Sequence, residues 1–220
     1  EPANVLPATD GTLFITSAFA RRILHIDATT TAATVPIGDI ALVEPQALLQ
    51  DANGDLLVSN HDNRNLLRLS GNTLSLEGET PVRSSSFSQR LDYQASLASD
   101  GSRLYLTDPS HHTIWRLRPG DETRWIFEPL TGTGVSGFSG DGGPAADAAV
   151  DHPTGLAIDP QGNVYFADTS NHRIRRIDAA TAEITTVWPK GEVDPVSRPT
   201  GLAFDSNGIL HFADAGHHQV

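Results

Sequence analysis

The sequence predicts an all-β protein built from repeated four-stranded antiparallel sheets. Its clearest feature is a repeat: HPTGLAIDPQGNVYFAD, which begins at His152, returns as RPTGLAFDSNGILHFAD from Arg198, 46 positions further along the chain. A fixed period of this size marks a protein in which each unit buries its apolar face against the next unit. The 19 Gly and 14 Pro residues are spread along the chain, as expected for many short strands joined by turns.

Each repeat contains the same elements in the same order. A short strand of small apolar residues at 155–158 leads into an Asp-x-x-Gly turn, in which glycine supplies the positive φ that such turns need. Further strands are expected at 164–167, 174–177 and 183–188, and no helical period competes with them. Weaker copies lie upstream, so the units begin near residues 2, 45, 94, 153 and 199.

Four antiparallel strands repeated about every 40 to 50 residues predict the blades of a β-propeller. The least bulky strand comes first in each unit, which suits a strand that lines the crowded axis where the blades converge. A β-sandwich also has short strands, but it does not repeat its turn chemistry so closely.

Four segments carry a resemblance to a known family. DGGPAA at 141–146, HPTGLAID at 152–159, GNVYFAD at 162–168 and NHRIR at 171–175 resemble an NHL repeat with its inter-blade loop. The first two units are more similar to the six-bladed propellers of the SMP-30/gluconolactonase group. The resemblance implies six blades, whereas this chain holds about four and a half, with an inter-blade insertion at 132–151 and an incomplete last blade. We therefore expect a truncated chain, or another chain or segment that completes the ring.

Composition excludes several kinds of partner and site. The formal net charge of −12 argues against nucleic-acid binding, which depends on Lys and Arg side chains that neutralise phosphates. No apolar run approaches the roughly 20 residues of a membrane span, so membrane insertion is not expected. The absence of cysteine excludes both a disulfide framework and a thiolate zinc site.

The starts of the first strands are one candidate site. The resemblance to SMP-30-type lactonases implies a divalent cation here, but the equivalent positions offer no carboxylate. One residue earlier, the units carry a polar set: Glu1, Glu44, Tyr93, His152 and Arg198. Glu44 and His152 could act as base and acid, or bind a metal together with Glu1. The alternative is that these side chains face solvent ahead of the strand.

Histidines in the loops between second and third strands are the second candidate. They comprise His61, His111, His112, His172, His217 and His218, and we expect them to gather on one face. The resemblance to a lyase group with NHL repeats implies zinc binding by several histidines, since neutral imidazole is a normal zinc ligand. The alternative is that these histidines belong to the usual NHL repeat sequence and bind no metal.

Two further groups of charged residues have competing interpretations. Asp141, Asp147 and Asp151 in the insertion could order around Ca²⁺, although the insertion lacks the carboxylate spacing of a helix–loop–helix calcium loop and is expected to be a connector. Arginines 173, 175 and 176 could form a basic face for RNA, but alternating surface charge on a half-buried strand is the preferred interpretation. Asp108, Asp168 and Asp214 are expected to accept hydrogen bonds from the backbone of their own turns.

The sequence thus favours a non-catalytic module that recognises protein or carbohydrate ligands, as part of a larger secreted or periplasmic bacterial protein. The candidate binding residues are the pore-mouth and loop positions Glu44, Tyr93, His152, Arg198, His61, His112, His172 and His218. No catalytic residue and no cofactor is predicted, with Ca²⁺ or Zn²⁺ as the alternative for the cofactor. The alternative function is a metal-dependent hydrolase or lyase of the lactonase-like kind.

Overall fold

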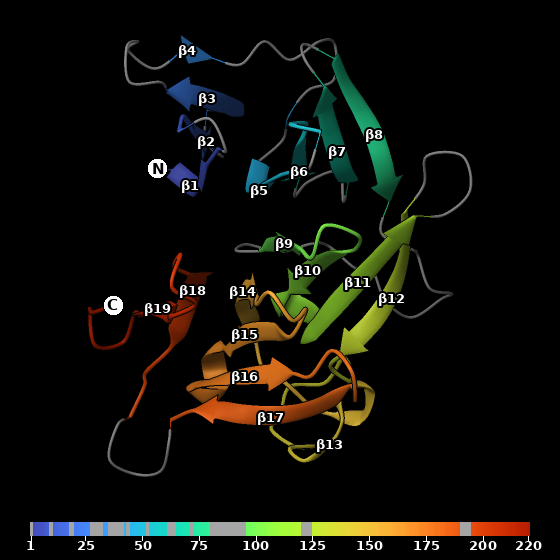
Figure 1. Ribbon diagram of the computed structural model, residues 1–220, viewed down its shortest axis with the longest axis vertical. Coiled ribbons are helices and arrows are strands. Elements are labelled where there is room, and N and C mark those ends of the chain that lie inside the picture. Colours follow the sequence, from blue (N-terminus) through green and yellow to red (C-terminus); the bar gives the residue numbers. More distant parts are fainter. Residues whose placement is uncertain are drawn as a thin grey trace. The chain divides into compact units, whose positions relative to one another are not determined.

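In the described part of the chain, the regular secondary structure is almost entirely antiparallel sheet (Figure 1). The computed structural model describes residues 2–8, 11–17, 20–26, 33–34, 42, 45–51, 53–60, 65–70, 73–79, 96–119, 125–189 and 195–220. The chain divides into two compact units, residues 1–97 with 118–127, and residues 98–117 with 128–220. Among the residues described, no helix is long and apolar enough to cross a membrane.

The first unit contains two four-stranded sheets. Each sheet is a meander, in which strands that follow one another in the chain are paired. Their strands are β1 (Pro2–Pro7), β2 (Leu13–Ser17), β3 (Arg22–Ile26), β4 (Ala33–Thr34), β5 (Pro45–Gln50), β6 (Leu56–Asn60), β7 (Asn65–Ser70) and β8 (Thr73–Glu79). Ile23, Leu42, Val58 and Leu67 are buried in the core of this unit.

A third meander joins β9 (Leu97–Ser99), β10 (Leu104–Asp108), β11 (Thr113–Pro119) and β12 (Trp125–Thr131). Strand β10 is buried along its whole length. The prediction of an all-β chain made of four-stranded antiparallel sheets is therefore confirmed, and these meanders are the blades that the repeat predicts.

The fourth sheet has one strand more than the repeat predicts. Strands β14 (Pro153–Ile158), β15 (Val164–Asp168), β16 (Arg173–Ile177) and β17 (Glu183–Trp188) form the expected meander, and the short β13 (Gly143–Pro144) adds to its outer edge. The addition comes from the insertion at 132–151, which also buries Ala145, Ala148 and Val150 in the core of the second unit. The insertion is thus part of the fourth sheet as well as a connection.

The last sheet is the pair β18 (Pro199–Phe204) and β19 (Leu210–Asp214). As in the fourth sheet, its first strand carries an irregularity directly after the proline, between Pro199 and Leu202 here and between Pro153 and Leu156 in β14. The repeated sequence therefore reproduces local backbone detail in addition to the strands.

The Asp-x-x-Gly turns explain why the first two strands of a sheet fold back on each other. Asp159 Oδ1 accepts the backbone N–H groups of Gln161 and Asn163, at 3.0 and 2.9 Å. Gly162 takes a φ of +84°, which an L-residue rarely adopts. The equivalent Asp205 Oδ1 accepts the N–H groups of Asn207 and Ile209 in the same way.

Gly155 allows neighbouring first strands to approach closely. A Cβ atom at this position would lie 2.0 Å from the carbonyl oxygen of Thr200 and 2.9 Å from the nitrogen of Leu202, both in β18. Gly201, the same position one repeat later, has nothing within 4 Å of such an atom. The two glycines of the repeated HPTGLA and RPTGLA segments therefore have different roles in this chain.

We predict that Gly155→Ala destabilises the chain by about 2 kcal/mol or more, because β18 must move away from β14 to admit the methyl group. Gly201→Ala is the matched control, and its free energy of unfolding should change by less than about 0.5 kcal/mol. Urea unfolding of both variants followed by circular dichroism measures the difference. Equal midpoints for the two variants would contradict the close approach.

Candidate functional site

Most candidate residues from the sequence lie at one end of the sheets of the second unit. We call this region the loop end, and it comprises residues 108–112, 132–138, 149–152, 168–172, 197–198 and 214–218, while the middle of the insertion runs along β17 to the other end of the fourth sheet. The turns after β10 and β15 form the short 3-10 helices η1 (Pro109–His111) and η3 (Thr169–Asn171), and the insertion contains a third, η2 (Ala145–Asp147).

The aspartates that end the second strands hold the backbone at the loop end. Asp168 Oδ1 accepts the backbone N–H of Asp151 at 2.7 Å and the side-chain amide of Asn171 at 2.9 Å. Asp214 Oδ1 accepts the N–H of Ser197 at 2.9 Å in the next sheet. The sequence predicted bonds from Asp108, Asp168 and Asp214 to the backbone of their own turns. The carboxylate of Asp108 does bond within its own turn, at His111. The backbone bonds of Asp168 and Asp214 instead reach back to the segment before the first strand of the same sheet.

Histidines after the second strands bind the next sheet. The backbone N–H of His152 donates to Nδ1 of His112, with an N···N distance of 3.2 Å. The backbone N–H of Arg198 donates to Nδ1 of His172 at 3.1 Å. We call these two bonds the first and second seam bonds. All four residues have a left-handed backbone, with φ between 47° and 55°, so the seams are held in a conformation that non-glycine residues seldom adopt.

The structure therefore combines the two predicted candidate sets in pairs. His112 meets His152, and His172 meets Arg198, so each pair joins a loop histidine to the residue that precedes the next first strand. His218 is exposed, with a φ of +57°. Glu1, Glu44, Tyr93 and His61 lie outside the described residues, so the predicted metal site of Glu44 with His152 stays a prediction.

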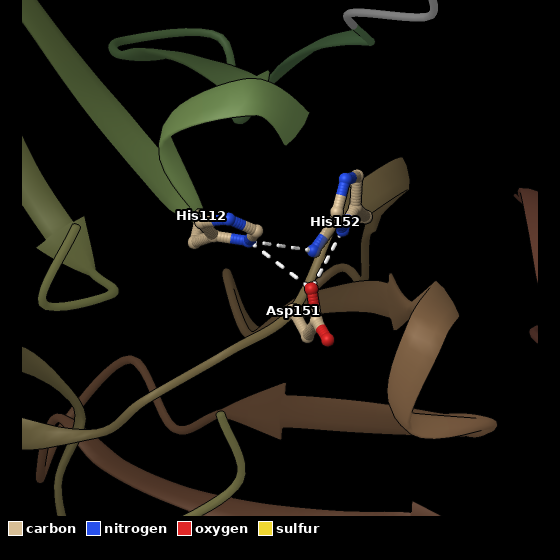
Figure 2. A group of neighbouring side chains, drawn as sticks. All are labelled: His112, Asp151 and His152. Carbon is tan, nitrogen blue, oxygen red and sulfur yellow. Dashed lines mark hydrogen bonds and ion pairs between the residues drawn. The ribbon is translucent and has the colours of Figure 1, made fainter. Parts of the chain in front are cut away.

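The first seam carries an additional carboxylate, Asp151 (Figure 2). Asp151 Oδ1 lies 2.6 Å from Nδ1 of His152 and 3.2 Å from Nδ1 of His112. The two imidazole rings meet edge to face, with centroids 4.7 Å apart. Burial lowers the pKa of His112, and the neighbouring His152 lowers it further, so His112 is neutral at pH 7. From the sequence, Asp151 could be assigned only to the insertion. It comes close to His112 only when neighbouring sheets pack side by side.

Arg175 is a fully buried cation that anchors the insertion. Its Nε and Nη2 donate to Asp141 Oδ1 at 3.1 and 2.7 Å, Nη2 also donates to the carbonyl oxygen of Ser139, and Nη1 donates to that of Ala149. Asp168 Oδ2 lies 3.5 Å from Nη1. The prediction of surface charge at Arg175 was therefore wrong, because the insertion covers this part of β16. The carboxylate of Asp141 is bound to Arg175 and to the hydroxyl of Thr186.

The insertion also presents apolar side chains to solvent. Val135 is 68% exposed and Phe138 is 45% exposed. The guanidinium of Arg173 stacks over the ring of Phe138, 3.6 Å from its centroid. The backbone beneath is fixed, because Asn171 Nδ2 donates to the carbonyl oxygen of Gly137 at 2.8 Å. Sequence reasoning identified the insertion but not this exposed surface on it.

A cavity of about 620 Å³ lies at the opposite ends of the same strands, among the two Asp-x-x-Gly turns at 159–162 and 205–208 and the shorter turn at 100–103. Arg103, Gln161 and Phe204 are among its lining residues. The carboxylates of Asp159 and Asp205 are oriented by the N–H groups of their own turns. The cavity is within the usual size range for small-molecule sites.

We predict that the free energy of unfolding falls as the pH rises from about 4 to about 6, and that Asp168 causes this fall. Burial raises the pKa of Asp168 to about 6, so the folded chain binds more protons than the unfolded chain in this window. This stabilisation is fully present below the unfolded pKa of 3.8 and is lost as the pH rises through the folded pKa, and its size is on the order of 3 kcal/mol. Urea unfolding at several pH values should show that Asp168→Asn removes this slope. An unchanged slope in the variant would assign it to other groups.

We also predict that Arg175→Met destabilises the second unit by about 3 to 5 kcal/mol, since Asp141 and two carbonyl oxygens lose their donor and Asp168 loses a nearby positive charge. Arg176→Met is the neighbouring control, because Arg176 is partly exposed and its ion pair with Asp178 is worth less than about 1 kcal/mol. Hydrogen exchange of residues 132–151 would rise in the first variant alone. Similar exchange in both variants would contradict an anchoring role for Arg175.

The comparisons with known proteins agree with this architecture. The family model of the teneurin NHL domain matches residues 36–194, more than two thirds of the chain. Mouse Teneurin-1 is 32% identical over 162 residues, which cover 69% of this chain and 6% of Teneurin-1. The chain therefore spans only a small part of that relative.

Solved structures show the same fold at low sequence identity. An auxiliary nutrient binding protein from Bacteroides ovatus has a TM-score of 0.78 at 14% identity, covering 100% of this chain and 58% of that chain. A structure of a nidogen/laminin complex has a TM-score of 0.68 at 12% identity, covering 97% of this chain and 72% of that chain. The β-propeller fold and the resemblance to NHL repeats are thus confirmed, and the chain belongs to the teneurin NHL domain family.

Proposed function

We propose that this chain is a recognition module that binds a protein partner through the loop end of its second unit. The observation that carries the proposal is the pair of Phe138 and Arg173, which is exposed on an insertion fixed by the buried Arg175. Aromatic and arginine side chains supply much of the binding energy at protein interfaces. A surface that is already fixed loses little conformational entropy on binding.

The chemistry of the loop end supports recognition over catalysis. Asp168 and Asp214 accept backbone N–H groups, as do His112 and His172 at the seams. These titratable groups therefore position the backbone. The side chains left on the outside include Val135, Phe138 and His152, a mixed apolar and polar set that suits the surface of another protein.

The comparison proteins are compatible with such a role. One solved structure of the same fold is that of a complex between nidogen and laminin, which are both proteins. Because this chain spans only about 6% of Teneurin-1, any partner has to be found for this chain directly.

Carbohydrate binding is the second candidate, and the cavity among the Asp-x-x-Gly turns favours it. The cavity combines the aromatic Phe204 with the polar side chains of Gln161 and Arg103. An aromatic surface beside hydrogen-bonding groups suits a sugar ring. This site lies on the other ends of the strands, so the two candidates can be separated by mutation.

We predict that Val135→Ser/Phe138→Ser weakens binding to a protein ligand by about 10-fold or more, because both side chains lose apolar contact area. The matched control is Ile209→Ser, which removes an apolar side chain of similar exposure, 56%, from the turn before β19. The probes are an array of purified extracellular and cytosolic proteins and an array of glycans.

A protein ligand that is lost in the double variant and retained in the control supports the proposal. Ligands found only on the glycan array, and lost on Gln161→Ala, would replace protein recognition by carbohydrate recognition. Protein ligands that bind all variants equally would place the interface elsewhere.

A further inference from the structure

Three metal-binding side chains converge at the first seam (Figure 2). His112 follows η1, whereas Asp151 and His152 directly precede β14. One ligand atom from each residue lies within 4.8 Å of the other two. The fold therefore assembles two imidazoles and one carboxylate from parts of the chain about 40 residues apart.

The three hydrogen-bonding contacts in this cluster cannot all be favourable at once, because there is no proton for one of them. Nδ1 of His112 accepts the N–H of His152, and Nδ1 of His152 donates its proton to Asp151 Oδ1. Nδ1 of His112 and Oδ1 of Asp151 then face each other as two acceptors, 3.2 Å apart. If Nδ1 of His112 carried a proton instead, it would face the N–H donor of His152. In either arrangement one contact is repulsive. A cation bound by Nδ1 of His112 and Oδ1 of Asp151 would remove the repulsion, and it would take the single lone pair of Nδ1 from the N–H of His152, which lies at the exposed side of the seam.

The donor set suits zinc. Two imidazole nitrogens and a carboxylate oxygen are common zinc ligands, and bonds of about 2.0 to 2.1 Å place tetrahedral ligand atoms roughly 3.3 Å apart. Oδ1 of Asp151 already lies 2.6 and 3.2 Å from the two histidine nitrogens. The side chain of His152 is 55% exposed, so an ion can reach the cluster from solvent. Three protein ligands leave a fourth position for water or for a donor from a partner.

The second seam shows that the backbone does not require this cluster. The seam bond from Arg198 to His172 has the same geometry, but Ser197 and Arg198 occupy the positions of Asp151 and His152. A serine and an arginine offer no comparable metal ligands. The Asp–His pair is therefore an addition at the first seam, where it is not needed to close the two sheets together.

We propose that His112, Asp151 and His152 bind a Zn²⁺ ion, which ties the turn after β10 to the segment before β14. The site shares His152 with the outside of the loop end, but Val135 and Phe138 contribute no ligand, so zinc binding and partner binding can be separated by mutation. Zinc bound here would replace the first seam bond by metal–ligand bonds to both sides of the same seam, and so hold the neighbouring sheets together more strongly within the second unit.

The test is a zinc titration of the purified 220-residue chain against a chromophoric chelator, together with its melting temperature. We expect one Zn²⁺ per chain at micromolar affinity or tighter, and a higher melting temperature with zinc. Asp151→Ser/His152→Arg copies the second seam into the first and should weaken binding by about 100-fold or more. His172→Ala is the matched control. It removes a seam histidine that belongs to no cluster of three metal ligands within the described part of the chain, so it should leave the zinc affinity unchanged.

A wild-type chain without stoichiometric zinc would overturn the proposal, and so would a double variant with wild-type affinity. Cobalt spectroscopy of the wild type keeps the test valid if the double variant fails to fold, because bound Co²⁺ should show the intense visible absorption of a four-coordinate site. Absorption typical of six-coordinate Co²⁺ would count against it. The Val135→Ser/Phe138→Ser variant should bind zinc normally, so loss of partner binding and loss of zinc binding are separate results.

Discussion

The second unit depends on the buried guanidinium of Arg175. A charged group removed from water is tolerated only when its N–H groups all meet acceptors, and Arg175 finds them in Asp141, Ser139 and Ala149. All three acceptor residues belong to the insertion, and they lie between 26 and 36 positions before Arg175 in the chain. The requirement to satisfy this cation therefore selects one conformation for a glycine-rich segment that has little apolar content of its own.

Titratable side chains in this protein serve mainly as hydrogen-bond acceptors for the backbone. Asp168 and Asp214 fix the segment before their own first strand, and His112 and His172 fix the corresponding segment of the next sheet. A buried N–H without an acceptor costs free energy, and these side chains supply acceptors where the sheet ladders end. The same residue types would indicate a catalytic centre if only their identities were considered. Their contacts distinguish positioning from chemistry.

The repeat was enough to predict the sheets, because strand order and turn chemistry are local properties. The strands at 164–167, 174–177 and 183–188 correspond to β15, β16 and β17, and the turn at Asp159 has the bonds expected of it. The fifth strand β13 and the burial of Arg175 could not be predicted, since both depend on where the insertion packs. The meeting of Asp151 with His112 depends likewise on the placement of one sheet beside another, which a spacing of 39 positions does not reveal.

The seam bonds have a consequence for how this family can change. The two residues of the first seam are 40 positions apart in the chain, whereas those of the second are only 26 apart, and yet the bonds are 3.2 and 3.1 Å long. The spacing of neighbouring sheets is therefore set by an imidazole and a backbone amide, and is insensitive to the length of the connection. Evolution can lengthen a connector and so create new surface chemistry while the scaffold stays unchanged. In this chain the longer connector is the one that carries the exposed Phe138, so the part whose length is least constrained by the seams is also the part that presents an aromatic side chain to solvent.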